Sequence, residues 1–283
     1  MAFDKYLNEA WSAHADNATA VADGFAQGYD LITEPAHITQ FANLVVHVYG
    51  EHLAKFQNGR IAIDQLKAHP LLTTEIAHDL ARFEATLCVA ESHEHQIDNF
   101  SVSEQIRILS AAMSTNAGLG KTDIAVELFG RISRLSADLP TGDPANRSIA
   151  VAANTVACTL EEKSEHSDTE KKLMLDAAHC SRKFWAIAGT WLQIQRAEYR
   201  LAKSYLKNSD ILNSIKHANL CLTLCQENSA APLDMFYAYE AIASVEKKMK
   251  QSLRSLPQME KYFELLSPED KNWCEKSLLN LKS

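Results

Sequence analysis

Residues 195–228 read QRAEYRLAKSYLKNSDILNSIKHANLCLTLCQEN and carry two apolar stripes at helical spacing. Leu201, Ala202 and Tyr205 form the first stripe, and the second follows a short polar turn. The second stripe consists of Ile215, Ala218, Cys221, Leu222 and Cys225. An amphipathic helix buries such a stripe against a neighbour. We therefore predict two antiparallel helices that pack together and stack on further pairs.

This stretch resembles a tetratricopeptide repeat, a pair of helices with small and aromatic residues at set positions. The positions of the pattern fall at Leu201, Ala202, Tyr205, Ser214, Ala218 and Cys221. The chain departs from it at Glu198, where the family favours Trp, at Ala218, where it favours an aromatic residue, and at Gln226, where it favours Pro. Residues 173–241 and 47–53 also resemble parts of uncharacterised bacterial proteins with such helices. The resemblance implies an all-α fold and no particular activity.

Three further segments are interpreted as divergent copies of the repeat. They are Gln40–His69, Gln105–Leu135 and Met235–Leu266. The spacing between copies varies, which indicates an irregular α-solenoid of antiparallel helix pairs. In the last segment, Ser267–Leu281, we expect Trp273 and Leu278 on one side of a helix that caps the stack.

The clearest break in the chain is Leu139–Pro144, which reads LPTGDP. It separates an N-terminal helical-repeat half, residues 1–139, from a C-terminal tetratricopeptide-like half, residues 140–283. We expect one continuous solenoid rather than two independent domains. Capping-box spacing marks two helix starts, Ser101 with Glu104 and Ser167 with Glu170. In total the chain is predicted to form about fourteen helices.

The composition of the chain indicates which classes of partner it is suited to bind. The chain has 283 residues, 28 Lys and Arg against 36 Asp and Glu, and a net charge of −8, which argues against nucleic acid and anionic lipid as partners. We expect no signal peptide, and the given sequence has no apolar run long enough to span a membrane. The six cysteines lack CxxC spacing and are expected to be reduced thiols in a cytoplasmic protein.

Gly118 to Thr122 read GLGKT, which ends like a phosphate-binding loop. The first glycine of that motif is replaced by Thr115, and the preceding residues have helical rather than strand spacing. We interpret the segment as a turn between helices, and no motif in the chain predicts a cofactor.

His47 and Glu51 lie four residues apart, as do Glu91 and His95. If the two pairs met, they could hold one metal ion of a hydrolase. The order of residues differs from the zinc-protease motifs, and a polar helix face explains the same residues.

Two other groups have a structural explanation. His217, Cys221 and Cys225 span two helical turns, about 12 Å, which is too far for one zinc ion, so the cysteines are interpreted as core residues. The polar run Glu161–Asp168 is interpreted as a solvated loop between helices.

In tetratricopeptide stacks the first helix of each pair lines a concave groove that meets the ligand. The resemblance therefore implies a set of groove residues in three copies of the repeat. They are Arg196, Tyr199 and Lys203, then His47 and Glu51, then Tyr237 and Glu240. Arginine and lysine pair with carboxylates, and tyrosine covers apolar groups. Exposed charges on a helix face are also expected without any ligand.

The first hypothesis is a cytoplasmic binding module for a peptide, a protein tail or a small acidic ligand. The second is a metal-dependent hydrolase built on His47, Glu51, Glu91 and His95. The third is a structural or self-associating scaffold. The sequence specifies neither the partner nor the oligomeric state.

Overall fold

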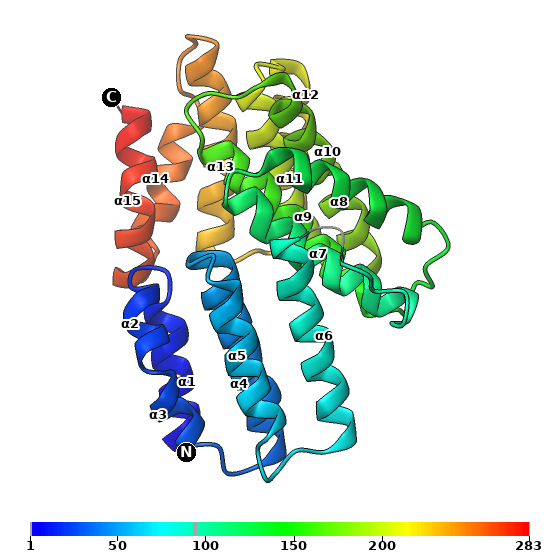
Figure 1. Ribbon diagram of the computed structural model, residues 1–283. Coiled ribbons are helices and arrows are strands. Elements are labelled where there is room, and N and C mark those ends of the chain that lie inside the picture. The colour runs from blue at the N-terminus through cyan, green and yellow to red at the C-terminus, as the bar shows by residue number, and fades with distance from the viewer. Residues whose placement is uncertain (1, 93–94, 283) are drawn as a thin grey trace. The chain divides into compact units, whose positions relative to one another are not determined.

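The protein is described by a computed structural model that covers residues 2–92 and 95–282. These residues form fifteen α-helices, one π-helix and no β-strand (Figure 1). Consecutive helices pack on their neighbours along the chain. The all-α, solenoid-like fold class predicted from the sequence is therefore confirmed.

The chain divides into two compact units, residues 1–148 and 149–283. The first unit contains α1 (Ala2–Ala13), α2 (Ala18–Asp23), α3 (Phe25–Asp30), α4 (Pro35–Val46), the π-helix η1 (His47–His52), α5 (Phe56–Lys67), α6 (Thr74–Glu91), α7 (Val102–Gly118) and α8 (Thr122–Leu135). Helix α9 (Ala145–Glu162) crosses the boundary. The second unit continues with α10 (Asp168–Ala188), α11 (Trp191–Lys207), α12 (Ile211–Glu227), α13 (Pro232–Lys248), α14 (Leu256–Glu264) and α15 (Pro268–Lys282). The sequence break predicted at residues 139–144 is the loop before α9.

The four predicted helix pairs are present. They are α4 and η1 with α5, α7 with α8, α11 with α12, and α13 with α14. Ala202 and Ser214 are small, buried residues at the contact between α11 and α12. The helices approach closely there, and the Ser214 hydroxyl donates a hydrogen bond of 2.7 Å to the Ala202 carbonyl. Cys221 and Cys225 are fully buried, which confirms their interpretation as core residues. All six cysteines lie in the described ranges, and all are free thiols.

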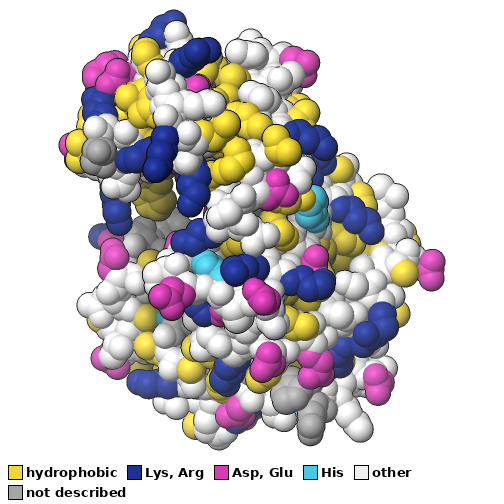
Figure 2. All heavy atoms as spheres, turned by 90° about the horizontal axis from the view of Figure 1, so that it is seen from above, with side chains coloured by type: hydrophobic (Ala, Val, Ile, Leu, Met, Phe, Trp, Pro, Cys, Tyr) yellow, Lys and Arg dark blue, Asp and Glu magenta, His cyan; other side chains and the backbone are white. Residues whose placement is uncertain are grey.

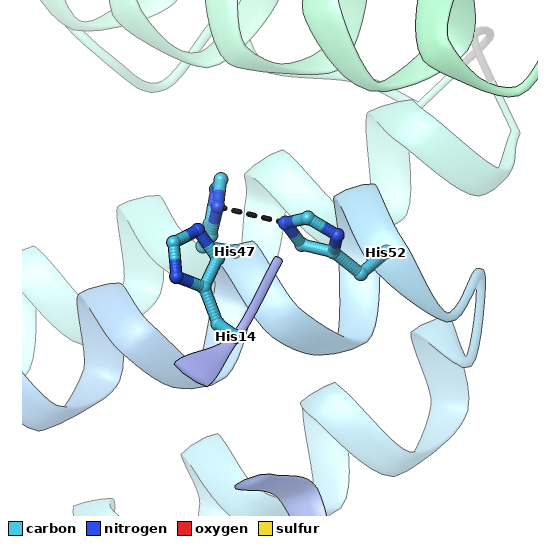
Figure 3. Close-up of side chains that lie close together, drawn as sticks. All are labelled: His14, His47 and His52. Carbon is cyan, nitrogen blue, oxygen red and sulfur yellow. Dashed lines mark hydrogen bonds between the residues drawn. The ribbon is translucent and has the colours of Figure 1, made fainter. Parts of the chain in front are cut away.

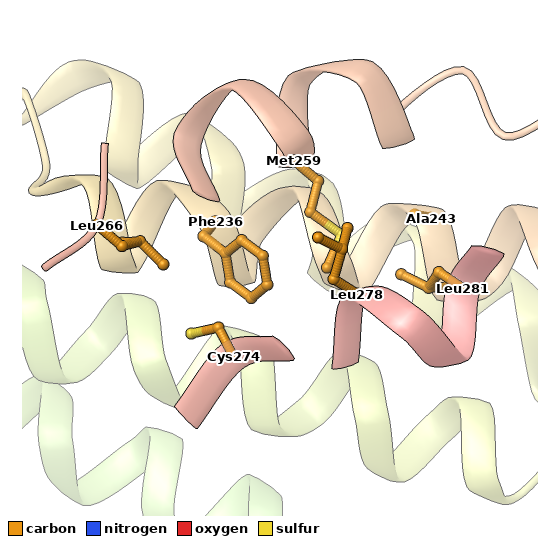
Figure 4. Packing of buried hydrophobic residues seen from close by; sticks show 7 residues of the cluster. All are labelled: Phe236, Ala243, Met259, Leu266, Cys274, Leu278 and Leu281. Atoms are coloured by element: carbon orange, nitrogen blue, oxygen red, sulfur yellow. The ribbon is translucent and has the colours of Figure 1, made fainter. Parts of the chain in front are cut away.

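The last three helices enclose an apolar cluster (Figure 4). Its buried members are Phe236, Ala243, Met259, Leu266, Cys274, Leu278 and Leu281. The prediction for the capping helix was therefore right for Leu278 and wrong for Trp273, whose exposed fraction is 78%. Cys274, Leu278 and Leu281 follow one another at helical spacing and form the buried stripe of α15, so the residue before Cys274 is turned away from it.

Both predicted capping boxes are formed. The Ser101 hydroxyl accepts from the Glu104 backbone N–H, and the Glu104 carboxylate accepts from the Ser101 N–H. Ser167 and Glu170 make the same exchange at the start of α10. These bonds satisfy donors that a helix start leaves free.

The GLGKT segment joins α7 to α8 as a turn, as predicted. Helix α7 ends at Gly118, α8 begins at Thr122, and Gly120 has a φ of 72°. Glycine adopts this left-handed conformation without the steric penalty of a side chain.

Two surface properties bear on partners. No helix within the described ranges is both long and apolar enough to cross a membrane. On the face presented in Figure 2, basic and acidic side chains are interspersed rather than separated into large fields of one sign. A charged partner would therefore have to recognise a local arrangement of side chains.

Candidate functional site

Four of the predicted groove residues of α11 and α13 contact one another. The Tyr199 hydroxyl donates a hydrogen bond of 3.0 Å to Glu240, and the Lys203 ammonium lies 2.6 Å from the other oxygen of the same carboxylate. Burial and the neighbouring Glu240 charge raise the pKa of Tyr199 well above its ordinary value. Tyr199 also packs edge-on against Tyr237, with ring centroids 5.6 Å apart. These contacts tie the first helices of two successive pairs together.

Arg196 lies farther toward the start of α11 and is paired differently. Its Nε atom lies 3.1 Å from Asp234 at the start of α13. The Arg196 side chain is 59% exposed, so this is a surface ion pair. The structure therefore places Arg196 apart from the Lys203 and Glu240 contact.

A pocket of about 540 Å³ opens beside Lys203. It is lined by the ends of α9, α11 and α13, all within residues 149–283. Its lining residues are Cys158, Glu161, Glu162, Arg200, Lys203, Leu206, Lys207 and Lys248. Four of these side chains are cationic and two are carboxylates. The volume is within the range of small-molecule sites.

A buried ion pair holds one wall of this pocket. Arg200 binds one carboxylate oxygen of Glu161, and the Ser204 hydroxyl binds the other. The side chains of Glu161 and Arg200 are 11% and 21% exposed. Burial raises the pKa of Glu161, while Arg200 and Ser204 act in the opposite direction. The Nε atom of Arg200 is buried and has no hydrogen-bond partner among the described residues.

The rim of the pocket carries free charges. Lys207 and Lys248 are exposed, and neither makes an ion pair with any residue that the structure describes. Glu162 on the rim is also exposed and unpaired within the same ranges. Lys207 and Lys248 are therefore the cations that a ligand could engage without breaking an existing pair.

Among the described lining residues, the Cys158 thiol is not an activated nucleophile. Burial raises the pKa of Cys158 to about 11, so its thiol stays protonated near neutral pH. The arrangement of fixed and free cations is suited to binding an anion rather than to thiol chemistry.

The predicted residues of the N-terminal unit lie in a different setting. His47 and Glu51 form a pair at 3.3 Å, and His47 belongs to a cluster with His14 and His52. Glu91 instead binds Arg60 at 2.5 Å, and His95 is exposed. Glu91 and His95 do not join the cluster, so within the described ranges the structure does not gather the four residues of the hydrolase hypothesis.

The sequence interpretation missed most of the pocket. Arg200, Lys203 and Lys207 lie at i, i+3 and i+7, which places three cations on one stripe of α11 and was a usable signal. Glu161 was assigned to a solvated loop, and this was wrong because α9 continues to Glu162 and buries the Glu161 side chain against α11. No pattern in the sequence indicated that Lys248 lines this pocket, because only the packing of the helices brings it to the same pocket as Lys207.

Comparison with known proteins adds no assignment: no protein-family model matches the chain, and no curated protein or solved structure is detectably similar to it.

Proposed function

We propose that the protein is a tetratricopeptide-like binding module that holds an anionic group of a peptide, protein tail or small ligand in the pocket between α9, α11 and α13. The observation that carries the proposal concerns Lys207 and Lys248, at the rim of a pocket already lined by Arg200 and Lys203. Neither lysine forms an ion pair within the part of the chain that the structure describes.

The helix arrangement supports the repeat class. Helix α11 contacts α13 directly as well as α12, which lies between them in the chain. First helices of successive pairs make such contacts in a stack of helical hairpins. The bonds from Tyr199 and Lys203 to Glu240 fix this contact, and they place Lys203 at the pocket wall.

The charges support an anionic ligand. Glu161 neutralises Arg200, and Glu240 neutralises Lys203, so these two cations mainly shape the wall. Lys207 and Lys248 have long flexible side chains that can close on a carboxylate or phosphate group. Exposed lysines act as point charges, so we expect affinity that falls as salt increases.

The test uses a fluorescent tetraglutamate peptide and measures its binding by anisotropy at low salt. Lys207→Glu and Lys248→Glu should each weaken binding by about three- to tenfold, because each change replaces an attraction by a repulsion. Lys276→Glu is the matched control, since Lys276 is an exposed lysine of α15 outside the pocket and forms no ion pair with the other described residues. The affinity of the Lys276→Glu variant for the peptide should stay within about twofold of that of the unmodified protein.

Two results would contradict the proposal. One is an equal loss of binding in all three variants, which would show only a general effect of net charge. The other is no binding of tetraglutamate together with native mass spectra that show no co-purified anion. A tetralysine peptide serves as the control for nonspecific attraction to the acidic chain.

A further inference from the structure

The histidine cluster of the N-terminal unit lies outside the proposed binding pocket. His14 follows the end of α1, and His47 and His52 are the first and last residues of η1. Each ring offers one nitrogen that could bind a metal, and these three nitrogens lie within 4.8 Å of one another. Figure 3 shows the three rings gathered at one place, with the hydrogen bond between His47 and His52 drawn as a dashed line.

The π-helix brings two of these histidines together. In an α-helix, residues five apart point about 140° away from each other. In η1 the backbone bonds close over five residues, as in the bond from the Leu53 N–H to the Val48 carbonyl. As a result, the Nε2 atoms of His47 and His52 lie 3.1 Å apart. Two nitrogens bound to one tetrahedral zinc ion at about 2.0–2.1 Å would have a similar separation, roughly 3.3 Å.

Polar contacts on the Nδ1 atoms of His47 and His14 help to orient the two rings. Nδ1 of His47 lies 3.3 Å from the Glu51 carboxylate, and Nδ1 of His14 lies 2.5 Å from the Trp11 carbonyl. Both oxygens can accept a hydrogen bond from Nδ1–H, and in that tautomer the lone pair of each ring is on Nε2. This outer arrangement is typical of metal-binding histidines and fixes the tautomer and the orientation of the ring.

Trp11 restrains the cluster further. Its ring packs against His14 and His47, with centroid distances of 5.2 and 5.1 Å. His14 and His47 are half-buried, whereas His52 is exposed to solvent. The cluster is therefore partly ordered by packing and reachable from solvent.

From this geometry we propose that His14, His47 and His52 bind one divalent transition-metal ion, with Zn²⁺ the best match. Three imidazoles leave a fourth tetrahedral position for water or another small ligand. On binding, the ion takes the place of the proton between the Nε2 atoms of His47 and His52. The donor ring releases this proton to solvent and takes up another on its Nδ1 atom, so that each ring stays neutral. The proposal uses a different site and unit from the anion pocket and does not depend on the proposed function.

The experiment is calorimetric titration of Zn²⁺ into tag-free, chelator-treated full-length protein. We expect one Zn²⁺ per chain. His52→Ala, which changes an exposed residue, should weaken binding at least about tenfold while the circular dichroism spectrum is unchanged. Glu51→Gln should weaken binding by about tenfold, because it removes the charged partner of a ligand histidine.

His95→Ala and Glu91→Gln are the matched controls, since these residues lie outside the cluster and would matter only in a site built on His47, Glu51, Glu91 and His95. Their affinities should stay within about twofold of the unmodified protein. Absence of stoichiometric Zn²⁺ binding at about 100 µM, or binding that His52→Ala leaves intact, would overturn the proposal. Co²⁺ added to the unmodified protein gives a second readout, because a tetrahedral site produces intense visible bands and the weak bands of an octahedral ion would contradict the assignment.

Discussion

Nδ1 of His217 donates a hydrogen bond of 2.6 Å to the carboxylate of Glu198, and this bond links α12 to α11. The other carboxylate oxygen accepts from Arg182 of α10 at 2.5 Å. Glu198 therefore joins three helices through ionic contacts. Burial alone would raise the pKa of Glu198, but its bonds with His217 and Arg182 lower it below the ordinary value.

Loss of the Glu198 carboxylate should destabilise the C-terminal unit strongly. Glu198→Ala leaves the Arg182 charge and the His217 ring without their partner, and we expect a loss of about 3–5 kcal/mol in the free energy of unfolding. Urea unfolding followed by circular dichroism measures it. Glu227→Ala, at an exposed position of α12, is the control and should change stability by no more than about 0.5 kcal/mol. Equal effects of the two variants would show that the three-helix contact is unimportant.

Stability should depend on pH through Glu170. The ion pair with Lys163, together with bonds from Ser167, lowers the pKa of Glu170 from 4.5 to about 2. Because the folded-state pKa is the lower one, the ionised carboxylate stabilises the fold above about pH 4.5, and this contribution is lost as the pH falls toward 2. Glu170→Gln should reduce stability by about 1–2 kcal/mol near pH 7, with a smaller difference near pH 3. A difference that stays constant over this range would contradict the assignment.

Substitution by alanine should have different effects on stability at two glycines, Gly28 and Gly118. A Cβ atom at Gly28 would lie 2.5 Å from ring carbons of Tyr6 and Phe41, so Gly28→Ala should cost about 1–3 kcal/mol through displacement of these rings. A Cβ atom at Gly118 would meet nothing within 4 Å. Gly118→Ala should be neutral or stabilise by up to about 1 kcal/mol. Melting temperatures of the two variants test this, and a Gly28→Ala protein as stable as the original would refute the packing argument.

The apolar cluster around Met259 should dominate the stability of the last three helices. Met259 is fully buried, and Met259→Ala should cost about 2–5 kcal/mol because a cavity remains. Leu279 in α15 is 57% exposed, so Leu279→Ala is expected to change stability by no more than about 0.5 kcal/mol. Denaturant titrations of both variants provide the comparison, and similar losses would mean that α15 packs differently.

The helix pairs were predictable because their determinants are local. Apolar spacing marks the faces of α11 and α12, and serine with glutamate three residues later marks the starts of α7 and α10. Apolar spacing did not determine which face of α15 is buried. Two adjacent residues, Trp273 and Cys274, are both apolar, and either could have belonged to the buried face. Only packing against α13 and α14 distinguishes them.

The candidate sites were predictable only in part because they combine residues that are distant in the chain. Lys203, Tyr199 and Glu240 were named from the repeat geometry, and the structure brings them together. Lys248 reaches the pocket only through the packing of α13 beside α11. His14 was missed because it is also distant in the chain. His52 was not predicted to share a site with His47 for another reason, since a change in helix type alters which residues share a face.

The π-helix between α4 and α5 makes the approach of His47 and His52 depend on backbone winding as well as on the presence of both residues. If this segment wound as an ordinary α-helix at the same length, the two imidazoles would point about 140° apart, although every histidine would be retained. Among related chains, loss of the π-helical winding alone would thus be sufficient to abolish the three-nitrogen arrangement.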